Sequence, residues 1–204
     1  MPHPLILLHG LWMRGIALTV LQRRLESVGY AVETLDYMSV AVPLERALHS
    51  LRERMCVHPQ GVHVVGHSLG GVLALLACRD GTGLPPGRVV CMASPLTGSA
   101  VARQLSEDGR GWLLGRNRHV LEHGLTAWNG TREVGMVAGC SGIGLGTMVG
   151  HLEGDNDGTV AVEETRLPGL TAHCVVETSH TGMLVSREAA SQVVAFLRHG
   201  RFHD

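Results

Sequence analysis

The chain lacks most of the features that mark nucleic-acid-binding, membrane or disulfide-rich proteins. It has no lysine: its 17 basic residues are all arginine, and with 18 acidic residues they give a net charge of −1. That balance gives no electrostatic reason to bind nucleic acid or an anionic membrane surface. No apolar run approaches the ~20 residues of a membrane span, so stable membrane insertion is not expected.

Cysteine is scarce and irregularly spaced. The five cysteines are odd in number and form no CxxC pair, which argues against a disulfide framework or a zinc site. The first residues lack the basic region and the long apolar segment of a secretory leader. On these grounds we expect a cytoplasmic protein without a bound metal.

The composition and the pattern of apolar residues favour one α/β domain over residues 1–204. Hydrophobic residues make up 45% and charged residues 17% of the chain, enough for a substantial core. Continuous apolar runs, typical of strands buried on both faces, alternate with helical stripes. This alternation predicts a three-layer sandwich, with a mostly parallel sheet of about six strands between two helical layers. Strands are predicted over residues 5–8, 30–35, 62–65, 88–92, 133–138 and 171–177, and helices over 17–28, 43–55, 72–78, 100–105 and 186–199.

The segment 62–78 carries the strongest chemical signal. An apolar run leads into Gly66-His67-Ser68-Leu69-Gly70, and a second apolar stretch follows. This order is typical of a nucleophile elbow, in which Ser is held on a strained strand-to-helix turn with its hydroxyl exposed. Glycine at both ends of the turn lets strand and helix approach closely. We predict Ser68 as a nucleophile and the N–H of Leu69, near the helix N-terminus, as one oxyanion donor.

A base and an acid should follow later strands, because active sites of parallel α/β sheets lie at the carboxyl ends of the strands. His180 follows the last predicted strand, where a ring nitrogen could accept the proton of Ser68. Asp157 is the favoured acid to hold the tautomer of His180. Asp155 is the alternative and is otherwise a turn residue. Calcium binding by the two aspartates is disfavoured, because the EF-hand spacing and its distal Glu are missing.

The loop after the first strand should supply the second oxyanion donor. Gly10 permits a tight backbone path there, and the N–H of Leu11 is favoured over that of Trp12. Trp12, Trp112 and Leu113 are candidates to line an acyl groove. Trp112 is equally well interpreted as a residue that serves ordinary packing and does not line the groove.

Together these motifs resemble the α/β-hydrolase superfamily, closest to its small bacterial lipase and esterase branch. The resemblance spans about residues 4 to 200, and the motifs that carry it are His9-Gly10, Gly66–Gly71, Asn156–Val160 and Ser179–Leu184, with Ala93–Ser99 similar to a TPHxGS stretch of those lipases. It implies a Ser68-Asp157-His180 triad and hydrolysis of carboxylic esters without a cofactor. The expected partner is a small-molecule ester or an acyl-lipid.

Two departures from the family pattern narrow this expectation. The chain begins at what would be the third strand of the full fold. The stretch that usually inserts a helical lid, about residues 96–130, is short, so a minimal fold with little or no lid and a soluble or short-acyl substrate is expected. A thioesterase or an acyltransferase would use the same groups. The same scaffold could also serve a non-catalytic binding module, a lyase or a cofactor-free peroxidase, and the oligomeric state stays open.

Overall fold

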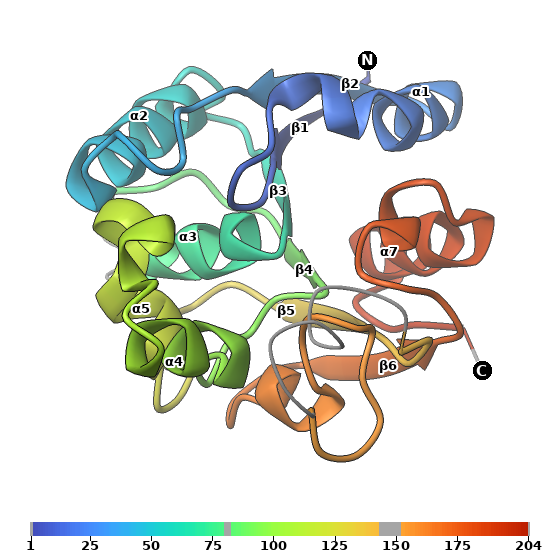
Figure 1. Cartoon of the computed structure of the whole chain (residues 1–204). Coiled ribbons are helices and arrows are strands. Elements are labelled where there is room, and N and C mark those ends of the chain that lie inside the picture. Colours follow the sequence, from blue (N-terminus) through green and yellow to red (C-terminus); the bar gives the residue numbers. More distant parts are fainter. Residues whose placement is uncertain (1, 80–82, 143–151, 204) are drawn as a thin grey trace.

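The centre of the protein is a six-stranded sheet in the order β2-β1-β3-β4-β5-β6 (Figure 1). The computed structural model describes residues 2–79, 83–142 and 152–203. Every neighbouring pair of strands is parallel. The strands are β1 (His3–Leu8), β2 (Tyr30–Leu35), β3 (His63–His67), β4 (Val89–Met92), β5 (Val134–Gly139) and β6 (Ala172–Val176).

Helices cover both faces of the sheet (Figure 1). One face packs against α1 (Thr19–Ser27) and α7 (Arg187–His199). The other packs against α2 (Leu44–Cys56) and α3 (Leu69–Cys78), with α4 (Ala100–Glu107) and α5 (Arg118–His123) in the same core cluster. Short 3-10 turns complete the described chain: η1 (Gly15–Leu18), η2 (Gly111–Asn117), η3 (Val162–Thr165) and η4 (Gly182–Leu184).

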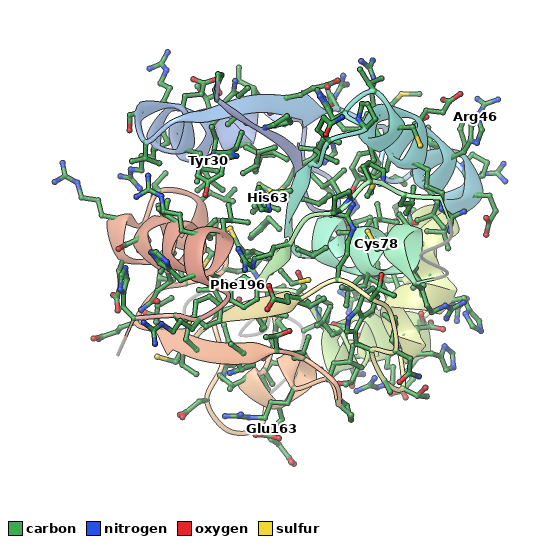
Figure 2. All side chains as sticks on the ribbon, turned by 180° about the vertical axis from the view of Figure 1, so that it is seen from behind. Tyr30, Arg46, His63, Cys78, Glu163 and Phe196 are labelled. Atoms are coloured by element: carbon green, nitrogen blue, oxygen red, sulfur yellow. The ribbon has the colours of Figure 1, made fainter. Side chains whose placement is uncertain are left out.

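The core consists of two apolar layers separated by the sheet. Along β1, Leu5 and Leu7 face α1 and α7, whereas Ile6 and Leu8 face α2 and α3. Phe196 of α7 is fully buried in the first layer (Figure 2). Because successive strand residues point to opposite faces, a strand between two helical layers must be apolar throughout. The predicted three-layer fold is therefore confirmed, and the continuous apolar runs are its cause.

The strand order places a topological switch point between β1 and β3. The chain runs from β1 to β2 on one side of the sheet and then returns to place β3 on the other side of β1. In open parallel sheets, ligands bind outside the carboxyl ends of the strands at such a point. The segments after β1 and β3 contain Leu11 and Ser68, so the sheet brings these two candidates to one edge.

The segment of residues 100–123, here called the cap segment, is short but mostly helical. The sequence predicts a helix over 100–105 alone, whereas the structure forms α4, η2 and α5. The helix signal is weak because η2 and α5 span seven and six residues, too few for a clear apolar period. Leu114, Val120 and Leu121 are nevertheless buried, so packing stabilises these turns. None of the helices in the described ranges has the length and apolar character that a bilayer crossing requires.

Candidate active site

Ser68 lies on a strained turn between β3 and α3. Its φ of 55° and ψ of −123° are rare for a residue with a side chain, and such a conformation costs about 1–3 kcal/mol. The N–H of Ser68 donates to the carbonyl of Met92 at 2.8 Å, which holds the turn to β4. A Cβ on Gly66 would lie 2.3 Å from the carbonyl of Gly70, so only glycine allows strand and helix to meet here. The geometry exposes a serine hydroxyl at the carboxyl edge of the sheet.

Asp157 and His180 form a partly buried hydrogen-bonded pair. The Oδ2 of Asp157 lies 2.8 Å from Nδ1 of His180, and the carboxylate is 1% exposed. Its Oδ1 accepts the N–H groups of Thr159 and Val160 at 2.9 and 2.7 Å. Because an ionised carboxylate can only accept, Nδ1 carries the proton and Nε2 remains an acceptor. Asp155, the alternative acid, is exposed, and its carbonyl accepts the N–H of Val162.

His67 supports the loop of His180 through a hydrogen bond. The ring is buried, and its Nε2–H donates to the carbonyl of His180 at 2.9 Å. The N–H of His180 donates to the carbonyl of Asp157 at 2.9 Å, so both backbone groups of His180 are held. His67 therefore holds the backbone of His180 in place. Burial, and then the neighbouring charge of His180, lower its pKa to about 3.

The backbone after β1 runs close to Ser68 and offers the N–H of Leu11 as a donor. Residues 9–14, here called the β1 loop, run close to the elbow, since a Cβ on Gly10 would lie 3.0 Å from Cβ of Ser68. The N–H of Trp12 donates to Oγ of Ser39 at 3.1 Å and is therefore engaged. Within the described ranges, the N–H groups of Leu11 and Leu69 make no hydrogen bond to the protein. Two backbone donors are thus available at the switch point, the number that an oxyanion hole needs.

Comparisons with known proteins identify the fold. A family model described as "Alpha/beta hydrolase" matches residues 28–123, which contain the Ser68 turn. The crystal structure of the mature lipase BlEst2 of Bacillus licheniformis is similar with a TM-score of 0.76 at 19% identity, over 98% of this chain and 93% of that chain. The protein has the α/β-hydrolase fold.

Other α/β-hydrolase neighbours differ in their described activities. The RedJ thioesterase from the prodiginine biosynthetic pathway of Streptomyces coelicolor has a TM-score of 0.61 at 14% identity, over 96% of this chain and 84% of that chain. A lipase-esterase related protein of Clostridium acetobutylicum has a TM-score of 0.68 at 12% identity, over 96% and 94%. The sequence matches no curated protein. At such low identities these likenesses establish the fold alone.

The hydrolase fold encloses a cavity of about 470 Å³ that contains both Ser68 and His180 in its wall. Its lining is mostly apolar and comes from the β1 loop, the cap segment and the loop after Asp157. Of the three predicted groove residues, Trp12 and Leu113 line the cavity, and Nε1–H of Trp12 donates to the carbonyl of Leu113 at 2.9 Å. Trp112 does not line it: its side chain is 75% exposed. In the tight turns of η2, the neighbours Leu113 and Leu114 point inward instead.

Several cavity residues of this hydrolase fold are not predicted from the sequence. Val101, Ala102 and Leu105 form one wall from α4, and Val160 contributes from the loop after Asp157. The only signal for them is the apolar face of a short helix, which looks the same for a core helix and for a ligand site. Their role becomes visible only once α4 is placed over the strand ends.

Glu164 joins the acid loop to the cap segment. Its buried carboxylate accepts the N–H of Ala100 at 2.5 Å and the N–H of Ala161 at 3.0 Å. Burial raises its pKa above the ordinary value for a glutamate. The sequence offers no sign of this, because Glu163-Glu164 reads as a pair of surface charges. The contact fixes the start of α4 relative to η3, and with it one wall of the cavity.

A second hollow, of about 570 Å³, lies at the opposite edge of the sheet. It is lined by His3, His58 and His63 among other residues, and burial lowers the pKa of His63 to about 4. No group of three or more His, Cys, Asp or Glu residues in the described ranges is arranged to hold a metal ion. We therefore take the cavity that Ser68 and His180 line as the candidate site.

Acid should destabilise the protein in part through His67. Its folded-state pKa of about 3 lies below the ordinary value of about 6.5. Between these values the unfolded chain binds one more proton than the folded chain, so this group lowers the free energy of unfolding by about 1.4 kcal/mol per pH unit as pH falls. Replacing His67 with Asn should remove this contribution, so that the free energy of unfolding falls less steeply between about pH 6 and 4 than in wild type. Urea unfolding at several pH values measures this free energy. Equal slopes for both proteins would contradict the prediction.

Proposed function

We propose that the protein is a serine hydrolase that cleaves carboxylic esters through an acyl-enzyme on Ser68. The observation that carries the proposal is the 2.8 Å hydrogen bond between Asp157 and Nδ1 of His180, beside a cavity that both His180 and Ser68 line. It leaves Nε2 of His180 as the acceptor in a site that also holds a serine on a strained turn. The proposed substrate is a small-molecule ester, and no metal or cofactor is required for this chemistry.

Acylation follows from these groups. Oγ of Ser68 attacks the ester carbonyl while Nε2 of His180 takes up its proton, and the C=O electrons move onto the oxygen. The N–H groups of Leu11 and Leu69 would stabilise that oxyanion. Collapse of the tetrahedral intermediate breaks the ester C–O bond, and the imidazolium returns its proton to the leaving alcohol. Asp157 holds the ring and stabilises its charged form throughout.

Deacylation repeats the same steps with water. His180 accepts a proton from the water as its oxygen attacks the acyl-Ser68 carbonyl, and the oxyanion is again bound by the two backbone donors. The intermediate then releases the carboxylic acid and returns the proton to Ser68. Net consumption is one water per ester, which balances the reaction without an external oxidant or reductant.

The cavity supports an acyl chain as the bound group. Its size is in the range of small-molecule sites, and Val101, Leu105 and Leu114 form a largely apolar wall. Arg110 lies at the lining but pairs with Asp108 at 2.8 Å, so its charge is already balanced. The same groups would act on a thioester. Matched oxygen and sulfur esters of one acyl chain decide between the two.

Fluorophosphonate labelling tests the proposal. Wild type should gain the mass of one probe group, located by peptide mapping to Ser68, and should turn over p-nitrophenyl butyrate. Ser68→Ala should gain none, because a phosphonyl adduct needs the activated nucleophile. Ser99→Ala is the matched control, since Ser99 lines the same cavity but its Oγ accepts the N–H of Ala102. A folded wild type that neither labels nor turns over esters or thioesters would overturn the proposal and favour a binding module.

A further inference from the structure

We propose that Asp36 and Ser39 are positioning residues that hold the oxyanion donor Leu11 in place. Both belong to residues 36–43, here called the β2 loop, which follows the strand beside β1. The inference rests on the proposed function, because it concerns the donor that would bind the oxyanion. Neither residue contacts the cavity at Ser68, so each acts through the β1 loop.

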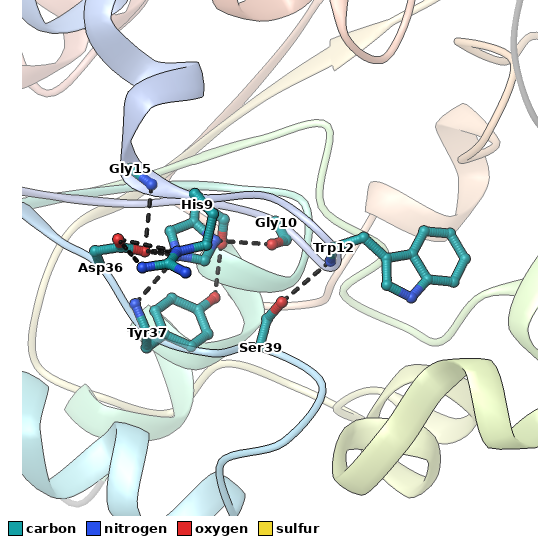
Figure 3. Close-up of polar contacts among 8 residues, drawn as sticks. His9, Gly10, Trp12, Gly15, Asp36, Tyr37 and Ser39 are labelled. Atoms are coloured by element: carbon teal, nitrogen blue, oxygen red, sulfur yellow. Dashed lines mark hydrogen bonds and ion pairs between the residues drawn. The ribbon is translucent and has the colours of Figure 1, made fainter.

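Asp36 clamps the β1 loop at both ends (Figure 3). At the start, its Oδ1 lies 3.0 Å from Nε2 of the fully buried His9. At the end, Nε of Arg14 donates to both carboxylate oxygens at 3.0 Å, and a terminal nitrogen of Arg14 donates to Oδ2 at 2.8 Å. The N–H of Gly15 adds a longer contact to Oδ1 at 3.3 Å. One carboxylate thus fixes residues on either side of Leu11.

Ser39 holds the middle of the same loop, and Tyr37 holds its start (Figure 3). Oγ of the buried Ser39 accepts the N–H of Trp12 at 3.1 Å, and the hydroxyl of Tyr37 donates to the carbonyl of His9 at 2.6 Å. The ring of Tyr37 stacks on His9 at a centroid distance of 4.3 Å. Ser39 is itself anchored, since Nδ2 of the buried Asn117 donates to its carbonyl. The β2 loop therefore links the β1 loop to the cap segment.

The β1 loop needs such support because its backbone is strained at Trp12, the residue next to the donor Leu11. Trp12 has a φ of 58°, in the left-handed region that L-residues avoid, at a cost of about 1–2 kcal/mol. Its own N–H is engaged by Ser39, which leaves the N–H of Leu11 as the free donor of the pair. An oxyanion donor works only within about 2.7–3.1 Å of the oxygen, so a small displacement of this loop would remove its contribution.

Asp36→Ala and Ser39→Ala test the inference through catalysis. Each should lower kcat by about 10- to 100-fold and leave KM within about threefold, because the lost interaction forms only in the transition state. The inhibition constant of a trifluoromethyl ketone analogue should rise by the same factor as kcat/KM falls. A general loss of stability is not expected to lower kcat while leaving KM unchanged.

Glu33→Ala is the matched control for Asp36→Ala. Glu33 lies in β2, just before Asp36, pairs with Arg54 at 2.8 Å and has a side chain 37% exposed, against 38% for Asp36. It contacts no part of the β1 loop in the described structure, and its removal should leave kcat unchanged. If Asp36→Ala and Ser39→Ala both behave like Glu33→Ala, the inference is wrong.

Hydrogen–deuterium exchange separates this inference from the proposed function. The hydrogen-bonded amides of Trp12 and Met13 should exchange at least about tenfold faster in both variants than in wild type and in Glu33→Ala, because the loop opens locally when its supporting hydrogen bonds are removed. This result does not depend on turnover. Inactive wild type with slow loop exchange would overturn the proposed function, while equal exchange in all four proteins would overturn the positioning role even if esters are cleaved.

Discussion

Replacing Asp157 with Asn should lower kcat by about 10⁴-fold, as expected when the orienting carboxylate of a Ser-His-Asp triad is neutralised. The amide retains the shape of the side chain but can donate to Nδ1 of His180, which favours the wrong tautomer. That tautomer places the proton on Nε2, the atom that must accept the proton of Ser68. The change therefore removes base catalysis without removing the cavity or the two backbone donors.

Asp155→Asn provides the matched comparison for Asp157→Asn. It is the same chemical change two residues away, but Asp155 is exposed and lies outside the cavity wall. We expect its kcat to stay within about twofold of wild type, as for surface substitutions away from the chemistry. The prediction is checked by measuring ester turnover of both variants across pH. Circular dichroism verifies that both variants are folded. Equal losses in the two variants, or a larger loss at Asp155, would refute the assignment of the acid.

The sequence predicts the elements whose signals are local. Gly66 and Gly70 around Ser68 indicate an elbow within five residues, because that turn admits no side chain at either end. Buried strands are recognisable as continuous apolar runs. His180 and Asp157 are predicted because each follows a strand, and in the structure their side chains meet at 2.8 Å. The order of strands along the chain is sufficient for this, because parallel strands all end at one edge.

Contacts between distant segments cannot be predicted in the same way. Asp36 looks like an ordinary residue after a strand, and its link to Arg14 emerges only when β1 and β2 lie side by side. Glu164 reads as a surface charge until α4 presents its N–H groups to it. Trp112 is a candidate for the acyl groove because aromatic residues often line such sites. Its direction depends on the turn type of η2, which the local sequence does not determine.

The three groups of the candidate site are held in place mainly by hydrogen bonds from neighbouring segments. Ser68 is held by β3 and β4, His180 by the carbonyl of Asp157 and by His67, and Leu11 by the β2 loop. Most of these supports are hydrogen bonds, and those made by His67, Ser39 and Tyr37 are buried or partly buried. Hydrogen bonds have directional geometry, so they fix donors and acceptors to within a few tenths of an ångström. Precision of this kind is what electrostatic stabilisation of a transition state requires.

Replacing Gly66 with Ala should have the largest effect on stability. The added Cβ would lie 2.3 Å from both the carbonyl carbon and the oxygen of Gly70, and 2.4 Å from the N of Gly71. These are backbone atoms of α3, so no side-chain rotation can relieve the overlap, and the helix must move away from β3. We expect a loss of about 3 kcal/mol or more in the free energy of unfolding, at the upper end of overpacking effects.

Gly83→Ala separates that steric effect from the general cost of losing a glycine. Gly83 has a φ of +80°, and an added Cβ would have no heavy atom within 4 Å, so only the left-handed backbone opposes the change, by about 1–2 kcal/mol. Urea unfolding of both variants compares the two costs directly. Since whole domains are stable by only about 5–15 kcal/mol, Gly66→Ala should also lower the yield of soluble protein. If Gly66→Ala unfolds at the same urea concentration as Gly83→Ala, then α3 can shift without penalty, and the close approach of strand and helix is not what requires glycine at the elbow.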